Sequence, residues 1–315
     1  MSAYRIVDRL HVDHAAEIGR LKQGLRNSPA TIEPKYFYDE LGCTLYAAIC
    51  QLDEYYPTRT ERAIFQAHRG DISEAIGKGG TFVDLGAGDC CKALGWLPFI
   101  EPERYLAIDI AGPSLETALA NMAPEFPQTD MVGLVTDFSL SLDIPDTLLT
   151  GRVTLFYPGS SIGNFSPESA TRFLREMRRY THDGGLLIGV DAKKDRARLD
   201  AAYADALGVT AAFNLNALRH INRVIGTDFD EKKWRHVGAY NPVLGRIEMH
   251  LESIADQAVI IDGLARQFQV GDRIHSESSY KYSREEFEAM LRTAGFSEIE
   301  VWTDVEQAFW VFYAR

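Results

Sequence analysis

The sequence predicts a mixed α/β fold, in which a Rossmann-type sheet flanked by helices is joined to a second, smaller domain. Three observations support this prediction. Short apolar runs alternate with helical patterns between about residues 81 and 190, which is typical of βαβ units in a parallel sheet. A glycine-rich turn directly follows the first apolar run. From about residue 196 the alternation stops, which marks the second domain.

The elements of the sheet domain follow in order along the chain. The first 70 residues are expected to form helices broken by loops. Parallel strands are expected at 81–85, 104–109, 131–135, 153–157 and 185–190. Helices are expected from the glycine turn to Trp96 and over 114–122, 167–180 and 284–294. The runs at 299–302 and 309–312 predict a closing antiparallel pair.

These elements define the expected domains. Residues 61–195 and 281–315 form the sheet domain. Residues 196–280 form an insertion with two helical stretches and several strands. Such an insertion is expected above the carboxyl ends of the strands, where open α/β sheets bind ligands. We expect the helical residues 1–60 to join it as a substrate-binding cap.

Composition and charge exclude several classes of protein. Lys and Arg number 33 against 45 Asp and Glu, a net charge of −12, which disfavours binding to nucleic acid. No apolar run approaches the roughly 20 residues of a membrane helix, and the N-terminus lacks a signal core. The four cysteines include no CxxC pair. We therefore expect a cytoplasmic monomer that acts on a small molecule, with no membrane or metal.

A nucleotide-type ligand is indicated by the turn Asp84–Gly88, which contains Gly86 and Gly88. Asp109 ends the second strand, where a carboxylate can accept hydrogen bonds from both ribose hydroxyls of an adenosine. A dinucleotide loop needs a third glycine three residues after the second, and Cys91 occupies that position. The acidic Asp84 suits a cationic sulfonium and amino group better than a pyrophosphate.

The third strand completes this prediction with Asp137 and Phe138, which can contact the amine and the ring of an adenine. Together these residues favour S-adenosylmethionine as the ligand. Two alternatives stay open: a glycine turn that serves packing only, and a nicotinamide oxidoreductase.

Polar and aromatic clusters indicate where an acceptor would bind. Aromatic residues gather at 36–39 and 54–61, and a small-residue loop at 159–165 carries Asn164. Glu277 and Ser279 share one face of a strand by their period-two spacing. The alternatives are packing tyrosines and an exposed polar edge strand. No two histidines have the i, i+4 spacing of a helical metal-ligand pair.

From about Tyr36 to the C-terminus, the sequence resembles the histidine Nα-methyltransferases of ergothioneine biosynthesis, which have a class I methyltransferase sheet. The resemblance rests on several segments in family order, namely 37–39, 54–61, 84–88, 156–165, 208–214, 246–251 and 276–282. It implies three successive methylations of the α-amine of L-histidine to hercynine, with S-adenosyl-L-methionine as methyl donor. The loop Asp89–Cys91 departs from the small polar residues of other members, but it leaves Lys92 aligned.

The resemblance also implies roles for individual residues. Donor contacts are Gly86, Gly88, Lys92, Asp109, Asp137 and Phe138. Tyr55 and Glu277 would bind the imidazole, with Ser279 beside it and Met249 lining the pocket. Asn164 and Tyr203 would hold the amino-acid head group, and Tyr38 would approach the amine, so that Tyr38 and Asn164 are the catalytic candidates. A thiohistidine or another imidazole or aromatic amino acid remains an alternative acceptor, and a non-catalytic binding module remains a third reading.

Overall fold

A computed structural model of the chain describes residues 4–10, 13–138, 141–181 and 183–315. The chain splits into two compact units. Unit 1 comprises residues 1–11, 60–192 and 282–315, and unit 2 comprises residues 12–59 and 193–281. The chain therefore enters unit 2 twice, once near its N-terminus and once through a long insertion.

Unit 1 is built on a single sheet, whose strand order within the described residues is β1-β5-β4-β3-β6-β7-β14-β13. Neighbours from β1 to β7 are parallel, whereas β14 is antiparallel to both β7 and β13. The strands are β1 (Tyr4–Asp8), β3 (Thr81–Leu85), β4 (Arg104–Asp109), β5 (Asp130–Val135), β6 (Val153–Tyr157), β7 (Gly185–Asp191), β13 (Ile299–Thr303) and β14 (Phe309–Ala314).

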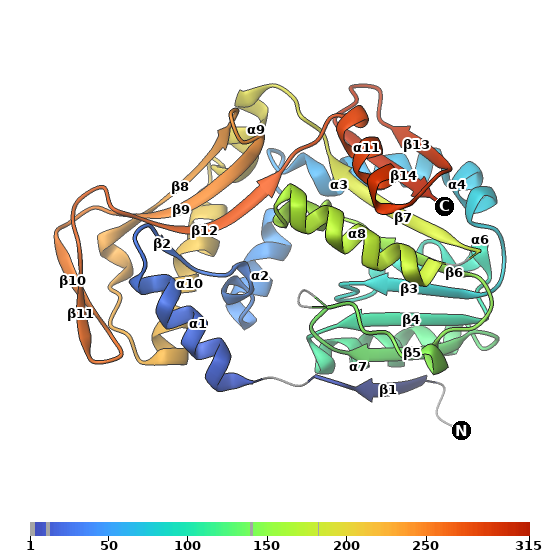
Figure 1. The fold of residues 1–315 in the computed structure, drawn as a ribbon, viewed down its shortest axis with the longest axis horizontal. Coiled ribbons are helices and arrows are strands. Elements are labelled where there is room, and N and C mark those ends of the chain that lie inside the picture. Colours follow the sequence, from blue (N-terminus) through green and yellow to red (C-terminus); the bar gives the residue numbers. More distant parts are fainter. Residues whose placement is uncertain (1–3, 11–12, 139–140, 182) are drawn as a thin grey trace. The chain divides into compact units, whose positions relative to one another are not determined.

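Helices cover both faces of this sheet, with α8 in front and α7 behind in the view of Figure 1. Residues of α8 that are buried recur every three or four positions, which gives the helix one apolar face. The α-helices are α3 (Tyr56–Ala67, which begins in unit 2), α4 (Arg69–Ile76), α5 (Cys91–Leu94), α6 (Leu97–Ile100), α7 (Gly112–Met122), α8 (Pro167–Thr181) and α11 (Arg284–Ala294). The short 3-10 helices are η2 (Ala123–Glu125), η3 (Asp146–Leu148) and η4 (Ser161–Asn164).

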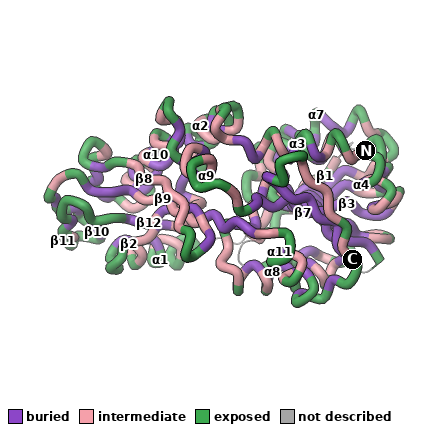
Figure 2. The backbone as a smooth tube through the Cα atoms, turned by 90° about the horizontal axis from the view of Figure 1, so that it is seen from above, coloured by how far each residue is buried: buried purple, intermediate pink, exposed green. Residues whose placement is uncertain are grey.

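The central strands of unit 1 are buried along their whole length. Every residue of β3, β6 and β7 is buried, and Figure 2 shows β3 and β7 as buried strands among more exposed helices. A parallel strand covered on both faces needs such a continuous apolar run. Most polar side chains that can reach a ligand are thus expected at the ends of the strands and in the loops that follow them.

Unit 2 contains a second sheet of order β2-β12-β9-β8 and a separate hairpin of β10 and β11. Its strands are β2 (Ala30–Thr31), β8 (Trp234–Asn241), β9 (Arg246–Ser253), β10 (Gln257–Ile261), β11 (Leu264–Phe268) and β12 (Arg273–Tyr280). Its helices are α1 (His14–Arg26), η1 (Pro34–Phe37), α2 (Glu40–Ile49), α9 (Arg196–Tyr203), α10 (Val209–Ile225) and η5 (Glu231–Lys233).

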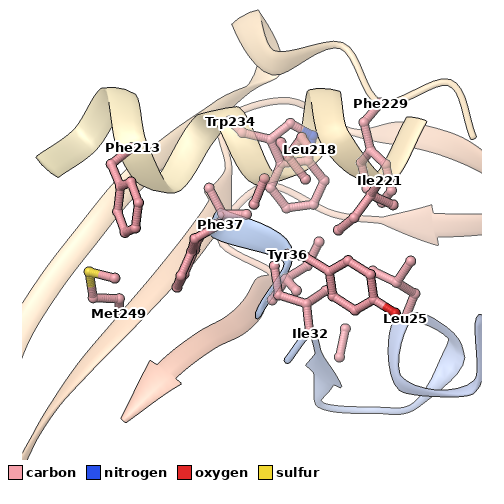
Figure 3. Close-up of a cluster of buried hydrophobic side chains, with 14 of the residues drawn as sticks. Leu25, Ile32, Tyr36, Phe37, Phe213, Leu218, Ile221, Phe229, Trp234 and Met249 are labelled. Carbon is pink, nitrogen blue, oxygen red and sulfur yellow. The ribbon is translucent and has the colours of Figure 1, made fainter. Parts of the chain in front are cut away.

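A core of its own holds unit 2 together. Figure 3 shows aromatic residues of η1 and α10 packed over the sheet, with Phe37 and Phe213 in contact at a ring-centroid distance of 4.8 Å. Met249 lies at the edge of this cluster and is 2% exposed. Residues 12–59 are therefore an integral part of unit 2, because they supply Tyr36 and Phe37 to its core.

The predicted fold class and most predicted elements are confirmed. Three differences concern short segments. Residues 4–8, expected to be helical, form strand β1 parallel to β5. Residues 30–31 form β2, which pairs with Ile274 and His275 of β12, and residues 274–280 are buried or half-buried, so the strand is not the exposed one of the alternative. The helix expected from the glycine turn to Trp96 is the short α5, which ends at Leu94, and a second short helix, α6, follows it and was not predicted.

Candidate active site

The glycine turn of unit 1 connects β3 to α5. Gly86 and Gly88 have φ angles of 71° and 54°, in the left-handed region that glycine adopts without strain. Asp109, at the end of the neighbouring strand β4, accepts hydrogen bonds from the N–H of Gly88 at 2.8 Å and from the N–H of Ala111 at 2.9 Å. Its carboxylate therefore fixes the turn, and with about four lone-pair sites it can accept further donors.

Phe138 follows β5 and lies beside the same turn. A Cβ atom added to Gly86 would lie 3.6 Å from the Phe138 ring. The ring stacks nearly parallel to Phe173 of α8, with a centroid distance of 6.1 Å and an interplanar angle of 11°. The turn, Asp109 and Phe138 thus come together, as predicted, and Asp137 precedes Phe138 in the chain.

Asp84 lies beneath the turn and is 2% exposed. Burial raises its pKa to about 7, although the Tyr105 hydroxyl, which donates to it at 2.8 Å, and the charge of Lys92 both lower that pKa. A positive charge bound nearby would stabilise the ionised carboxylate. The chemistry of this carboxylate therefore fits a cationic sulfonium and ammonium better than an anionic pyrophosphate.

Lys92 joins the glycine turn to the loop after β6 through Glu61. The buried Glu61 carboxylate accepts from the Lys92 ammonium at 2.7 Å and from the N–H of Gly159 at 2.6 Å. A Cβ on Gly189 of β7 would lie 2.1 Å from a Glu61 oxygen, so a larger residue there would displace this carboxylate. Sequence reasoning did not identify Glu61 as a linking residue.

The loop after β6 holds Asn164 at the end of η4, where the residue is exposed. Ser160 adopts a left-handed conformation, and its hydroxyl accepts from the N–H of Asp191 at 2.8 Å. The loop is thereby fastened to the end of β7. These contacts place Asn164 at the carboxyl edge of the sheet in unit 1, the same edge as the glycine turn.

In unit 2, Glu277 is positioned by a β-bulge. The pairing of β12 with β9 shifts between His275 and Glu277, so that Glu277 lies opposite Met249. The extra residue is Ser276, whose single hydroxyl proton is shared between two acceptors, the Asn214 side-chain oxygen at 2.8 Å and the Met249 carbonyl at 3.1 Å. A bulge changes the direction of the side chains that follow it. The extra residue Ser276 therefore determines on which face of the sheet the Glu277 side chain lies.

Glu277 and Ser279 share one face of β12, as predicted, and the alternation continues to Lys281. The Lys281 ammonium donates to the Ser279 hydroxyl at 2.9 Å and to the Tyr203 hydroxyl at 3.1 Å, and Tyr203 donates to Ser279 at 3.1 Å. Burial raises the pKa of Glu277 to about 7, against the lowering effect of the Lys281 charge. Lys281 is 1% exposed and was missed by sequence reasoning.

Aromatic side chains from the N-terminal segment surround this group. The Tyr55 ring meets the Tyr203 ring edge-to-face at 6.1 Å. Tyr38, which is 46% exposed, packs edge-to-face on Tyr46 at 5.8 Å and interacts electrostatically with Glu277 and Tyr203. Six of the residues that the resemblance assigns to the acceptor gather within unit 2, namely Tyr38, Tyr55, Tyr203, Met249, Glu277 and Ser279.

His236 and Gly238 of β8 determine how Tyr203 packs against the sheet. The Nε2 of His236 is 2.7 Å from the carbonyl of Tyr203, and its Nδ1 is 2.9 Å from the amide of Asn214. Burial lowers the pKa of His236, so the ring is neutral, accepts from Asn214 and donates to Tyr203. A Cβ on Gly238 would lie 2.4 Å from the same carbonyl, so only glycine permits this approach.

Tyr38 and Asn164, the two catalytic candidates, belong to units 2 and 1 respectively. Among the residues that the structure describes, no group of three or more His, Cys, Asp or Glu could hold a metal ion. None of the described helices is both long and apolar enough to cross a membrane.

In the sheet of unit 1, the antiparallel strand β14 lies between β7 and β13. This sheet and its glycine turn define a class I methyltransferase domain.

Comparisons with known proteins identify the family. The profile of the family described as "Histidine-specific methyltransferase, SAM-dependent" matches residues 17–315. The chain belongs to this family.

Individual relatives agree with this assignment. The chain is 36% identical over 309 residues to the histidine N-alpha-methyltransferase of Mycolicibacterium smegmatis, covering 95% of each chain. It is 34% identical over 289 residues to the Mycobacterium tuberculosis protein of the same name, covering 89% of each. It is 33% identical over 295 residues to ergothioneine biosynthesis protein 1 of Neurospora crassa, covering 90% of this chain but 32% of that protein.

Proposed function

We propose that this protein methylates the α-amine of L-histidine three times, with S-adenosylmethionine as methyl donor, and so produces hercynine for ergothioneine biosynthesis. The observation that carries the proposal is the group in unit 2 of one carboxylate, Glu277, and two hydroxyls, those of Ser279 and Tyr203. It occurs in a chain that belongs to a histidine-specific family. An imidazole and an amino-acid head group need this combination of acceptors and donors.

The donor would be held by residues of unit 1. We assign the ribose hydroxyls to Asp109, the adenine to Asp137 and Phe138, and the amino-acid end to Lys92 and the turn containing Gly86 and Gly88. When bound, S-adenosylmethionine supplies an electrophilic methyl group on a cationic sulfur. The buried Asp84 and the glycine turn support this assignment, because they suit a ligand that carries positive charge close to the backbone.

The acceptor would be held mainly by residues of unit 2. We assign the imidazole to Tyr55, Glu277 and Ser279, with Met249 lining the pocket opposite Glu277. Asn164 and Tyr203 would hold the amino-acid head group, and Tyr38 would orient the amine. The edge-to-face contact of Tyr55 with Tyr203 supports a pocket that grips the ring beside the head group.

The task of these residues is alignment and control of one proton. The amine must be neutral to act as a nucleophile, and a carboxylate in direct contact with it would retain its proton. The amide of Asn164 and the phenol of Tyr38 orient the amine without that penalty. Glu277 acts at the imidazole, away from the amine. Holding reactants in line can lower a barrier by several kcal/mol, in the range of about 7–11 kcal/mol for the best intramolecular cases.

Incubation of the protein with S-adenosylmethionine and histidine, followed by mass spectrometry, tests the proposal. Trimethylation confined to the α-nitrogen supports it. Turnover of a thiohistidine or an aromatic amino acid in preference to histidine would contradict it and would favour the alternative acceptor. Isothermal titration with a nicotinamide dinucleotide in parallel distinguishes the oxidoreductase alternative, for which we expect no binding.

The proposal extends to the setting of the enzyme, which we expect to be a cytoplasmic monomer without metal or nucleic-acid partners. Its net charge of −12 and four free cysteines support this setting. The test of the monomer is light scattering of the purified protein.

A further inference from the structure

Lys281 is a buried charge to which the mechanism above gives no task. Lys281 is 1% exposed and directly follows the last residue of β12, two positions after Ser279. The ammonium donates to Ser279 and to Tyr203, and it lies 4.9 Å from the centre of the Tyr203 ring. Burying an ammonium group is costly unless its N–H groups donate hydrogen bonds. The burial of Lys281 therefore calls for an explanation.

The two hydrogen bonds fix the direction of other hydrogen bonds. An ammonium has three donors and no acceptor, so neither Ser279 nor Tyr203 can direct its own proton at Lys281. Tyr203 instead donates to Ser279 at 3.1 Å. The Ser279 oxygen then accepts two hydrogen bonds, which uses both of its lone pairs. Ser279 is consequently restricted to acting as a donor toward any further partner.

Glu277, two residues before Ser279 on the same face, presents the opposite property. An ionised carboxylate only accepts hydrogen bonds, and the charge of Lys281 favours that ionised form. The three residues therefore offer one acceptor and one donor, side by side on a strand. The hydroxyls of the surrounding Tyr46 and Tyr55 stay neutral, because burial raises the pKa of both.

We propose that Lys281 is a positioning residue that determines the polarity of the ring pocket: it makes Ser279 a donor and keeps Glu277 an acceptor. The pocket then accepts a ring with one N–H and one unprotonated nitrogen, which is the neutral imidazole. Phenyl satisfies neither group, and indole satisfies only Glu277. This inference rests on the proposed function, because it concerns the same ring pocket. Lys281 would determine which ring binds without touching the ring, through Ser279 and Glu277.

A double-mutant cycle tests the proposal. Histidine binding is measured by isothermal titration with S-adenosylhomocysteine already bound, for wild type, Lys281→Met, Ser279→Ala and the double variant. We expect Lys281→Met to weaken histidine binding by about tenfold and to leave binding of S-adenosylhomocysteine unchanged. In the Ser279→Ala background the same substitution should cost much less, because the donor that Lys281 orients is gone.

Two further variants separate positioning from packing. Lys281→Arg keeps the charge and should restore most of the histidine affinity that Lys281→Met loses. Full additivity in the cycle, or equal losses for Lys281→Arg and Lys281→Met, would overturn the proposal. If Lys281→Met does not fold, Ser279→Ala decides, since it should weaken binding of histidine but not of phenylalanine, and an equal effect on both would overturn the proposal.

Failure of the proposed function gives a different result. Wild-type protein that does not bind histidine at all, yet methylates another imidazole compound, would contradict the choice of substrate. The cycle repeated with that compound would still test Lys281. Unchanged affinity for that compound in Lys281→Met would overturn the inference itself.

Discussion

Asp109 is the donor-site residue with the most definite geometry, because each of its oxygens already accepts a backbone N–H. We expect Asp109→Ala to weaken binding of S-adenosylhomocysteine by roughly 1.5–3 kcal/mol, the range for hydrogen bonds to charged groups. Isothermal titration measures this change. Glu116→Ala, an exposed position on α7, is the control and should bind as wild type. Unchanged affinity in Asp109→Ala would contradict the assignment of the ribose to this carboxylate.

Glu277 makes histidine binding depend on pH. Burial raises its pKa to about 7, so the carboxylate that accepts the imidazole N–H is lost as the pH falls through 7. The ratio of wild-type to Glu277→Gln affinity for histidine should therefore rise between pH 6 and pH 8, while the titration of histidine itself cancels in the ratio. Isothermal titration at several pH values, with Glu285→Gln as control, measures it. A ratio independent of pH would count against Glu277 as the charged acceptor.

The same pKa shift has a consequence for stability. The folded pKa of Glu277 exceeds the usual value of 4.5, so between about 4.5 and 7 the folded chain binds a proton that the unfolded chain has lost. The contribution of this group to the free energy of unfolding is full below that range and decreases as pH rises through 7. A site for a charged acceptor is thus maintained at the expense of stability at neutral pH.

Removal of the whole side chain tests the role of Glu277 in selectivity. Glu277→Ala should keep donor binding and lower kcat/KM for histidine about tenfold or more, since it leaves a ring N–H unpaired. It should also lower the ratio of kcat/KM for histidine to kcat/KM for phenylalanine. Steady-state kinetics with both acceptors measures both effects. Wild-type efficiency together with unaltered selectivity would mean that Glu277 does not contact the acceptor ring.

The alternation that links Glu277 to Ser279 is visible in the sequence. Nothing in the sequence indicates that it continues to a buried Lys281. A lysine in a strand is normally solvated, and nothing local shows that this one is buried under Tyr203. Glu61 was missed for a similar reason, because its partners Lys92 and Gly159 are 31 and 98 residues away. Residues whose burial depends on distant partners leave no local pattern.

At the level of elements, the approach of α9 to β8 positions Tyr203. Gly238 allows this approach, and a Cβ there would lie 2.4 Å from the Tyr203 carbonyl. We expect Gly238→Ala to lower the free energy of unfolding by about 1–3 kcal/mol through overpacking and to weaken histidine binding while donor binding is retained. Urea unfolding and isothermal titration measure the two effects.

Gly19→Ala is the matched control for this prediction. Gly19 lies in helix α1 with nothing within 4 Å of an added Cβ, so alanine there should stabilise the helix by roughly 0.5–1 kcal/mol and leave histidine binding unchanged. Equal histidine affinity for wild type and Gly238→Ala would show that the contact of Gly238 with Tyr203 does not set the pocket.

Elements with a strong local pattern were predicted well. The strands from β3 to β7 are short, mostly apolar runs, and α8 has a clear helical period. Strand β1 was not predicted, because a five-residue strand that pairs with β5 more than 120 residues later has no signal of its own. The bulge at Ser276 was not predicted either, since it is defined by the register with β9 and not by the residue.

For the whole molecule, the division into units separates the two kinds of binding residue. The residues assigned to the donor lie in unit 1, and those assigned to the imidazole lie in unit 2. Each group is fixed by contacts within its own unit, such as Asp109 to Gly88 and Lys281 to Ser279. A substitution that affects only one of these groups should therefore change the affinity for one ligand and leave that for the other unchanged.

The extent of the reaction is the prediction that involves the whole molecule. A methylated amine is still a nucleophile when it has lost its proton, and neither of the groups assigned to the amine, Tyr38 and Asn164, is a carboxylate that would retain that proton. Methylation should therefore continue until the nitrogen has no lone pair, which occurs after the third transfer. We expect mono- and dimethylhistidine to appear and then decline, and a trimethylated product with a permanent positive charge to accumulate.

Fragment mass spectrometry over a time course measures this progression and locates the methyl groups. Histidine incubated with the donor alone is the control for non-enzymatic transfer, and Asp109→Ala should slow all three steps because each one consumes a new donor molecule. The dimethyl species, supplied as the starting acceptor, should give the same final product. A single methyl group on the imidazole ring would contradict the prediction, because a ring nitrogen would then be the nucleophile and Glu277 would have to contact the reacting end of the substrate.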